Sequence, residues 1–417
     1  MGVERSFARA AGIDLGKRAM SVCIRVQGRG GGVELEEGVY TTMTSQILAL
    51  RDRLEAAGVQ VVAMEATGDY WRPVYWILSS TLPGAQVLVV NPAHVRILKG
   101  RKTDRKDAAF LARQAAAGNL SGSFIPPPPV REVRDLTRRR TVLSTLRGAE
   151  AQRLEKTLED TGIKLSSVIT DIVGVTGRTI LGALCAGERD PRTLAALARP
   201  NVKASRAELA EALTGHFTDH HGYLTADHLE EIDHYTAKIR ALDARIAALL
   251  DTPDQHTDLE NLATIPGIDR VGAQIIVSEL GHEMTAFPTA GHLASWLGLV
   301  GGHNESAGVK RKARRGDGNG AMRRILGAAA FSVMGHKGTY LNARYHRLRG
   351  HMDSRKAQVA IMHDMAIAIW HILHDKVPYR ELGPDYFARP DPDKIRRRIH
   401  ALARSIGATI EITTNPT

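Results

Sequence analysis

The chain has 417 residues, of which 43% are hydrophobic and 24% are charged, and its formal net charge is +11. These values are typical of a soluble globular protein with two or three domains. The positive charge favours a polyanionic partner, although surplus lysine and arginine can also serve solubility alone. Two isolated cysteines, Cys23 and Cys185, argue against a disulfide framework or a thiolate zinc site. No apolar run reaches the ~18 residues that span a bilayer, so we expect no membrane contact.

The first 125 residues predict strands followed by alternating helices and strands. Residues 8–40 hold three strand-like stretches with short turns between them, which predicts an antiparallel meander. The rest of this region predicts a helix at 45–58, a strand at 59–68, a helix at 70–80, a strand at 85–90 and a helix at 103–118. This β-β-β-α-β-α-β-α order is that of an α/β ribonuclease-H-like (RuvC-like) domain, which we assign to residues 1–125.

A helical arm is predicted for residues 126–252. Four prolines at 126–129 end the first domain, because proline continues neither a helix nor a sheet. Two long charged stretches follow, at 130–162 and 226–250, with apolar residues at helical spacing. They form either a coiled coil between copies of the chain or a plain hairpin on their own domain. The apolar stripe predicted for the first stretch includes Val142, Leu143, Leu146 and Leu154.

Four histidines between and within these stretches lack accompanying cysteines. We interpret them as solvated or helix-capping residues rather than metal ligands; they are His216, His220, His221 and His228.

A mostly α-helical third unit is predicted for residues 253–375. Its opening, "LATIPGIDRVGAQ", has an apolar residue on each side of Pro266-Gly267 and a helix after it, the pattern of a helix-hairpin-helix motif. The glycine hairpin would offer backbone N–H groups to a phosphate, whereas the alternative is an ordinary turn between helices. Residues 376–417 form a tail with one basic helical stretch, "DPDKIRRRIHALARS".

Four carboxylates fall on three elements that meet in a ribonuclease-H-like domain. Asp14 lies on the first strand, Glu65 ends the fourth, and Asp104 and Asp107 lie on one face of the closing helix. Each acid alone has an ordinary explanation, such as a turn or a helix cap. Together they predict a Mg²⁺ site for phosphodiester cleavage, which needs converging carboxylates. An actin-like ATPase is excluded because no second phosphate loop and no Gly-x-x-x-x-Gly-Lys-Ser/Thr loop occur.

A serine on a glycine-flanked loop is the second candidate centre. Ser306 precedes a cationic run and a helix whose two arginines lie off its apolar face. A serine beside guanidinium groups can attack a phosphodiester, although a loop serine is usually only solvated. The candidate nucleic-acid-binding residues are Gly267, Lys310, Arg311, Lys312, Arg314, Arg315, Arg323 and Arg324.

The motifs "GIDLGK", "MEATGDYW", "KTDRKDA", "IPGI" and "GNGAMRRIL" occur in this order across residues 8–335. In this combination the chain resembles the DEDD transposases of the insertion sequence one-ten family, relatives of the pilin-gene invertases. The resemblance implies that Asp14, Glu65, Asp104 and Asp107 bind Mg²⁺ and that Ser306 is the nucleophile. The family often has Ser-Ser-Gly where this chain has Ser306-Ala307-Gly308.

The resemblance further implies donor and target DNA as partners and a structured bridge RNA as guide. The two long helical stretches, and the need to hold two DNA sites together, predict a homo-oligomer, a dimer or tetramer. The cysteine usage fits a reducing cytoplasm, and we expect the protein at the nucleoid. Two alternatives stay open. One is a RuvC-like nuclease or junction resolvase that uses water, with a C-terminal half that only binds DNA. The other is a non-catalytic nucleic-acid binder with the same fold.

Overall fold

The computed structural model describes residues 6–28, 31–66, 68–92, 104–300, 305–306, 309–310, 318–387 and 392–410, with the backbone alone for 104–106, 305–306, 309–310 and 392–395. The chain divides into two compact units, Met1–Ile125 and Pro126–Thr417. Among the helices that the structure describes, none combines the length and apolar character needed to cross a membrane.

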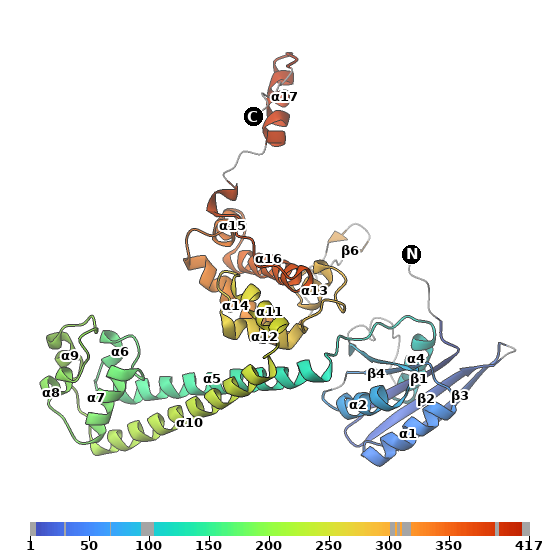
Figure 1. Ribbon diagram of the computed structural model, residues 1–417, viewed down its shortest axis with the longest axis horizontal. Coiled ribbons are helices and arrows are strands. Elements are labelled where there is room, and N and C mark those ends of the chain that lie inside the picture. Colours follow the sequence, from blue (N-terminus) through green and yellow to red (C-terminus); the bar gives the residue numbers. More distant parts are fainter. Residues whose placement is uncertain are drawn as a thin grey trace. The chain divides into compact units, whose positions relative to one another are not determined.

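The first unit is built on a mixed five-stranded sheet with the strand order β3-β2-β1-β4-β5 (Figure 1). The first three strands pair antiparallel, and β4 and β5 extend the sheet parallel to β1. The strands are β1 Arg9–Leu15, β2 Ala19–Gln27, β3 Val33–Thr41, β4 Val61–Glu65 and β5 Gln86–Val90. The predicted meander and the element order are thereby confirmed, and they are compatible with a ribonuclease-H-like domain.

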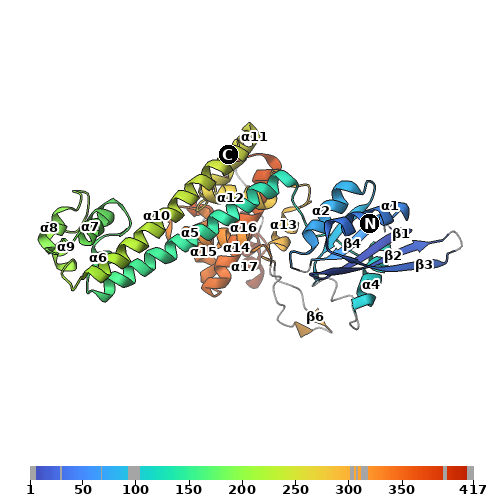
Figure 2. The ribbon, with the colours of Figure 1, turned by 90° about the horizontal axis from the view of Figure 1, so that it is seen from below.

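Helices cover both faces of this sheet (Figure 2). Helices α1 (Thr44–Ala56) and α2 (Trp71–Thr81) cover one face, and α4 (Asp104–Ala116) covers the other. Side chains alternate between the faces of a strand, so the sheet has two buried apolar layers. The first includes Ala11, Ile13, Val62, Met64, Leu50 and Leu78; the second includes Ala10, Val61, Ala63, Leu111 and Ala115.

Gly12 lets α4 lie directly on β1. A Cβ atom at this position would stand 2.1 Å from the carbonyl oxygen of Ala108 and 2.4 Å from the amide nitrogen of Ala112. Both are backbone atoms of α4, so any side chain would push the whole helix away from the strand. The end of β1 and the first turns of α4 are therefore in close contact.

The second unit begins with two long helices that lie side by side, α5 (Pro128–Asp160) and α10 (Asp219–Leu249) (Figures 1 and 2). Short helices connect their far ends: α6 Leu165–Val168, α7 Val175–Cys185, α8 Pro191–Ala196 and α9 Arg206–Ala212. These helices share a buried apolar cluster with the ends of α5 and α10, which includes Leu154, Leu158, Ile180, Leu209 and Ile232. The two long helices were predicted, whereas this small helical unit was not.

The predicted apolar stripe of α5 is only partly buried. Leu143 and Leu154 are buried, but Val142 is 49% exposed and Leu146 is 40% exposed. The choice between a coiled coil of two copies and a hairpin within one chain stays a prediction, because exposure in a single chain fits a contact between copies. Within the chain, α12 (Arg270–Leu280) also packs against α5. This second contact buries the polar residues Thr137 and Arg140 instead.

Two of the four histidines have clear structural roles. The His221 Nδ1 atom lies 2.8 Å from the Thr218 hydroxyl at the start of α10, as expected of a capping residue. His228 differs from the prediction, because it lies within α10 and its Nδ1 atom is 2.6 Å from the Glu150 carboxylate of α5. Among the side chains that the structure describes, no group of histidine, cysteine or acid residues gathers to bind a metal.

The remaining helices pack around α16 (Ser354–Asp375), which contacts four of them. Those four are α11 Pro253–Ala263, α13 Ala290–Trp296, α14 Gly320–Gly335 and α15 Tyr340–Arg349. Trp370 fixes part of this core, because its indole N–H donates to the carbonyl of Phe287 at 2.7 Å. The chain continues through the short helix η1 (Pro384–Phe387) and the basic helix α17 (Pro392–Ser405).

Candidate functional site

Asp14 and Glu65 stand at the ends of two neighbouring parallel strands. The pairing of β1 with β4 sets Ile13 opposite Met64, so one further step places Asp14 opposite Glu65. Side chains two residues apart on a strand point to the same face, so Asp14 shares the face of Gly12 and Glu65 shares the face of Ala63. This is the face that α4 covers. Each is partly buried. The two predicted strand acids are thus neighbours on one face of the sheet.

Asp107 is on the first turn of α4, directly before Ala108, the residue in contact with Gly12. Its side chain is only 8% exposed. The helix runs back along β1, because its end at Ala116 accepts a hydrogen bond from the amide of Phe7. Its beginning, with Asp107, is therefore near the end of β1 that holds Asp14. Asp104 opens the same helix, and its side chain lies outside the described residues.

Carboxylates on β1, β4 and α4 suit Mg²⁺, which binds oxygen ligands and is usually held by one or two carboxylates plus waters and substrate phosphates. The described side chains alone do not form a group of three ready to bind an ion. The donor set nevertheless fits a hard cation, since it contains acids and no thiol or imidazole. Asp14, Glu65 and Asp107 are therefore candidate ligands, and Asp104 stays a prediction because its side chain is not described.

A hollow over β2 and β3 is lined by residues that were not singled out from the sequence. It measures about 270 Å³ and is lined by Ser21, Glu37 and Ala108 together with Val22, Gly38 and Val39. Ser21 is the cross-strand partner of Asp14. Glu37 pairs with Cys23, whose thiol pKa is raised by burial and by the Glu37 carboxylate. The alternation of side chains along β2 could have indicated Ser21, because Ser21 lies on the same face as Cys23, and Cys23 pairs with Gly12.

The segment with Ser306 lies between α13 and α14. Ser306 belongs to β6 (Glu305–Ser306), which pairs with β7 (Val309–Lys310) in a two-stranded antiparallel ladder. The side chains of Ser306 and Lys310 are not described, and Arg311, Lys312, Arg314 and Arg315 lie outside the described residues. On α14, Arg323 is partly buried and Arg324 is exposed.

The turn with Gly267 connects α11 to α12. Gly267 has a left-handed backbone, with φ of 85°, and a Cβ there would stand 2.6 Å from the carbonyl oxygen of Ala329. At the start of α12 the Asp269 carboxylate accepts from the amide of Gly272 at 2.7 Å. An internal carboxylate thus takes an N–H group that a phosphate would use. The phosphate contact of Gly267 stays a prediction.

Comparison with known families gives two matches. Residues 11–163 match a family model for DEDD transposases of the IS110 type, and residues 259–346 match a model described as "Transposase IS116/IS110/IS902 family". The chain belongs to the IS110 family of transposases. This IS110-family transposase is accordingly a DNA-acting enzyme of an insertion element, as the sequence motifs predicted.

The two matches cover both candidate centres of the transposase. The first includes all four acids and the second includes Ser306. Residues 164–258, with the small helical unit and α10, lie outside both matches, as do residues 347–417. A search of curated proteins found no match.

Proposed function

We propose that this transposase cuts and rejoins DNA through a Mg²⁺-dependent acid centre and a covalent bond to Ser306. The observation that supports the acid centre best is the placement of Asp14 opposite Glu65, with Asp107 on the helix packed over Gly12. A DEDD-type match implies a divalent metal, and the all-oxygen donor set favours magnesium.

The acids position the reacting groups. Bound metal supplies charge stabilisation for the attacking and leaving oxygens of a phosphodiester. Asp14 and Glu65 present their carboxylates from a rigid sheet, and Asp107 presents its carboxylate from a helix held by backbone contact. The sheet and the helix would thereby fix the directions from which the carboxylates hold the metal.

Ser306 would conserve the energy of the phosphodiester bond. Its hydroxyl loses a proton, Oγ forms a bond to phosphorus, and the bond from phosphorus to one sugar oxygen breaks, which leaves a free DNA hydroxyl. Attack by the hydroxyl of another DNA strand reverses the step and restores the serine. The cations that follow Ser306 in the sequence, together with those on α14, would offset the charge on phosphorus.

Recombination must hold two DNA sites together, and we infer a homo-oligomer that brings acids and serine of different copies to one site. The net charge of +11 suits nucleic acid as the partner, and the family resemblance adds a guide RNA. Light scattering of the protein, free and with nucleic acid, tests this assembly; a monomer in both states would count against it.

Metal binding and recombination together test the acid centre. Asp14→Asn, Glu65→Gln and Asp107→Asn should each abolish recombination, because each removes a charged ligand. Each should also weaken Mg²⁺ binding in calorimetry of the protein without DNA. Glu55→Gln is the matched control, since Glu55 is an exposed acid on α1, on the opposite face of the sheet and outside the proposed set. Full wild-type activity in EDTA, or full activity of the acid variants, would refute the metal centre.

A further inference from the structure

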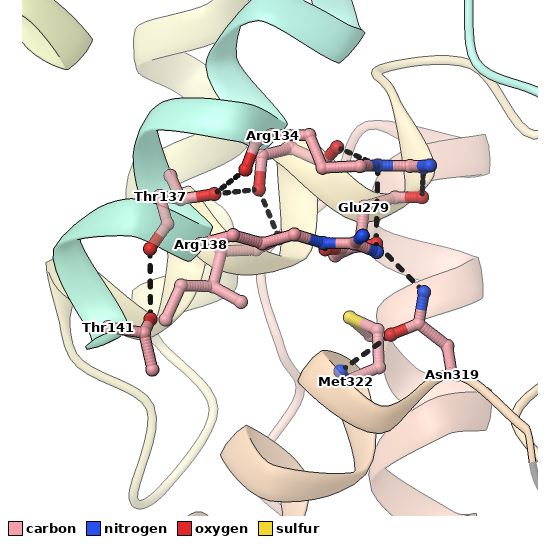
Figure 3. Close-up of polar contacts among 9 residues, drawn as sticks. Arg134, Thr137, Arg138, Thr141, Glu279, Asn319 and Met322 are labelled. Carbon is pink, nitrogen blue, oxygen red and sulfur yellow. Dashed lines mark hydrogen bonds and ion pairs between the residues drawn. The ribbon is translucent and has the colours of Figure 1, made fainter. Parts of the chain in front are cut away.

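A fully buried carboxylate in the last turn of α12 joins three separate elements of the second unit. Glu279 is 0% exposed. From α5, Arg138 donates to it through Nε at 2.7 Å and Nη2 at 3.0 Å, and the Arg134 Nε atom lies 3.2 Å from the same carboxylate. From the start of α14, the Asn319 side-chain amide donates to it at 2.8 Å. Figure 3 shows these side chains converging on Glu279.

The α5 side of this network is held by more than charge. Arg134 also donates to the backbone carbonyls of Ser278 and Glu279, at 3.1 and 2.6 Å. The Thr137 hydroxyl lies 2.8 Å from that of Ser278. Because a buried carboxylate is costly unless paired and hydrogen-bonded, Glu279 has few alternative arrangements. The N-terminal part of α5 and the C-terminal end of α12 are thus fixed to each other.

Asn319 stands at the end of the segment between α13 and α14 that contains Ser306, which we call the Ser306 segment. Asn319 uses both ends of its side chain, since Nδ2 donates to Glu279 and Oδ1 accepts from the amide of Met322 at 3.0 Å. It therefore caps α14 and anchors it at once. The preceding Gly318 has φ of 57°, and a Cβ there would stand 2.2 Å from the carbonyl oxygen of Leu297. The two flanks of the Ser306 segment are consequently in backbone contact.

We propose that Glu279 is a positioning residue for Ser306, because it fixes the end of the Ser306 segment to the arm helix α5. This inference rests on the proposed role of Ser306. From Arg138, α5 continues to Asp160, about 33 Å along its axis. The contact gives a direct physical link between the orientation of the arm and the segment that holds the nucleophile.

Two substitutions at Asn319 separate the link from the helix cap. Asn319→Ser keeps a good capping residue but is too short to reach Glu279. Asn319→Asp also keeps the cap, but sets a second carboxylate against Glu279. Asp243→Asn is the control, since it alters another arm contact, the 2.8 Å bond from Arg140, that does not involve Asn319.

Three quantities are measured for each variant: the rate at which the Ser306–DNA bond forms at saturating nucleic acid, the affinity for nucleic acid, and the midpoint of thermal unfolding. Asn319→Ser and Asn319→Asp should each slow this rate at least about tenfold, with nucleic-acid affinity and thermal midpoint near wild type. Asp243→Asn should leave the rate unchanged. A wild-type rate in Asn319→Asp and Asn319→Ser, or a loss that follows the thermal midpoint alone, would overturn the proposal.

Hydrogen exchange separates this inference from the serine proposal. Asn319→Ser should raise amide exchange in the first turn of α14 in the protein without DNA, and unchanged exchange there would show that Glu279 does not hold the segment. Absence of any serine–DNA bond in the wild type would instead overturn the serine proposal and, with it, the catalytic purpose of the link.

Discussion

Gly12→Ala tests whether backbone contact between β1 and α4 places the acids. A Cβ at position 12 would stand 2.1 Å from the Ala108 carbonyl oxygen. An ordinary contact needs about 3.4 Å, so α4 must move away by roughly 1.3 Å. Asp107 directly precedes Ala108 and would move with the helix. The substitution therefore displaces one acid from the pair on β1 and β4 without changing any carboxylate.

Two magnitudes follow from this displacement. Overpacking a well-packed core typically costs about 1–3 kcal/mol of unfolding free energy. A misplacement of about 1 Å in a catalytic site can cost about 100-fold in rate. We therefore expect recombination to fall by about 100-fold in a protein that is still folded at 25 °C, with weaker Mg²⁺ binding.

The assay compares recombination, Mg²⁺ affinity and thermal unfolding of Gly12→Ala with those of Gly32→Ala. Gly32 lies in the turn between β2 and β3, and a Cβ there would meet nothing within 4 Å. The control should match the wild type in all three measurements. Wild-type recombination and Mg²⁺ affinity in Gly12→Ala would refute the argument that α4 is held by contact at this glycine.

Two further predictions concern the arm and the cations. Burial raises the pKa of Glu150, but hydrogen bonds from His228 and Arg153 outweigh it, so the net pKa is below its ordinary 4.5. Because its pKa is lowered on folding, the Glu150 carboxylate stabilises the fold above pH 4.5, and this contribution is lost as the pH falls through the lowered pKa. The thermal midpoint of Glu150→Gln should therefore fall less on acidification than that of the wild type. An equal fall in both proteins would contradict this prediction. The second prediction concerns the cations, through a charge reversal of Arg314, Arg315, Arg323 and Arg324 together. This variant should bind nucleic acid more weakly, and the slope of log affinity against log salt concentration should fall by up to about 4. An unchanged slope would mean that these arginines form only a solvated surface.

Local sequence patterns predicted much of the first unit. Alternating apolar residues indicate strands, and the acid at the end of each run indicates where the strand presents a polar group. Asp14, Glu65 and Asp107 accordingly lie on the predicted elements. Gly12 was not singled out, because a close approach of α4 depends on tertiary packing that no local period shows.

The second unit shows where sequence patterns fail. The Glu279 network joins Arg138 to a residue 141 positions later, and a surface-like charge pattern on a helix gives no sign of such burial. Val142 and Leu146 have the spacing of a core stripe, yet they are exposed because polar residues of α5 face α12 instead. Helical periodicity defines an apolar stripe but not which neighbouring element packs against the helix.

The most direct test of the central claim is a covalent protein–DNA bond at Ser306. Wild-type protein is incubated with Mg²⁺, labelled DNA and cognate RNA, denatured, and examined for an alkali-labile adduct. The account predicts the adduct in the wild type, with loss of both adduct and recombinant DNA but retained DNA binding in Ser306→Ala. Normal recombination by Ser306→Ala, or cleavage by the wild type without any adduct as expected of a resolvase that uses water, would contradict it.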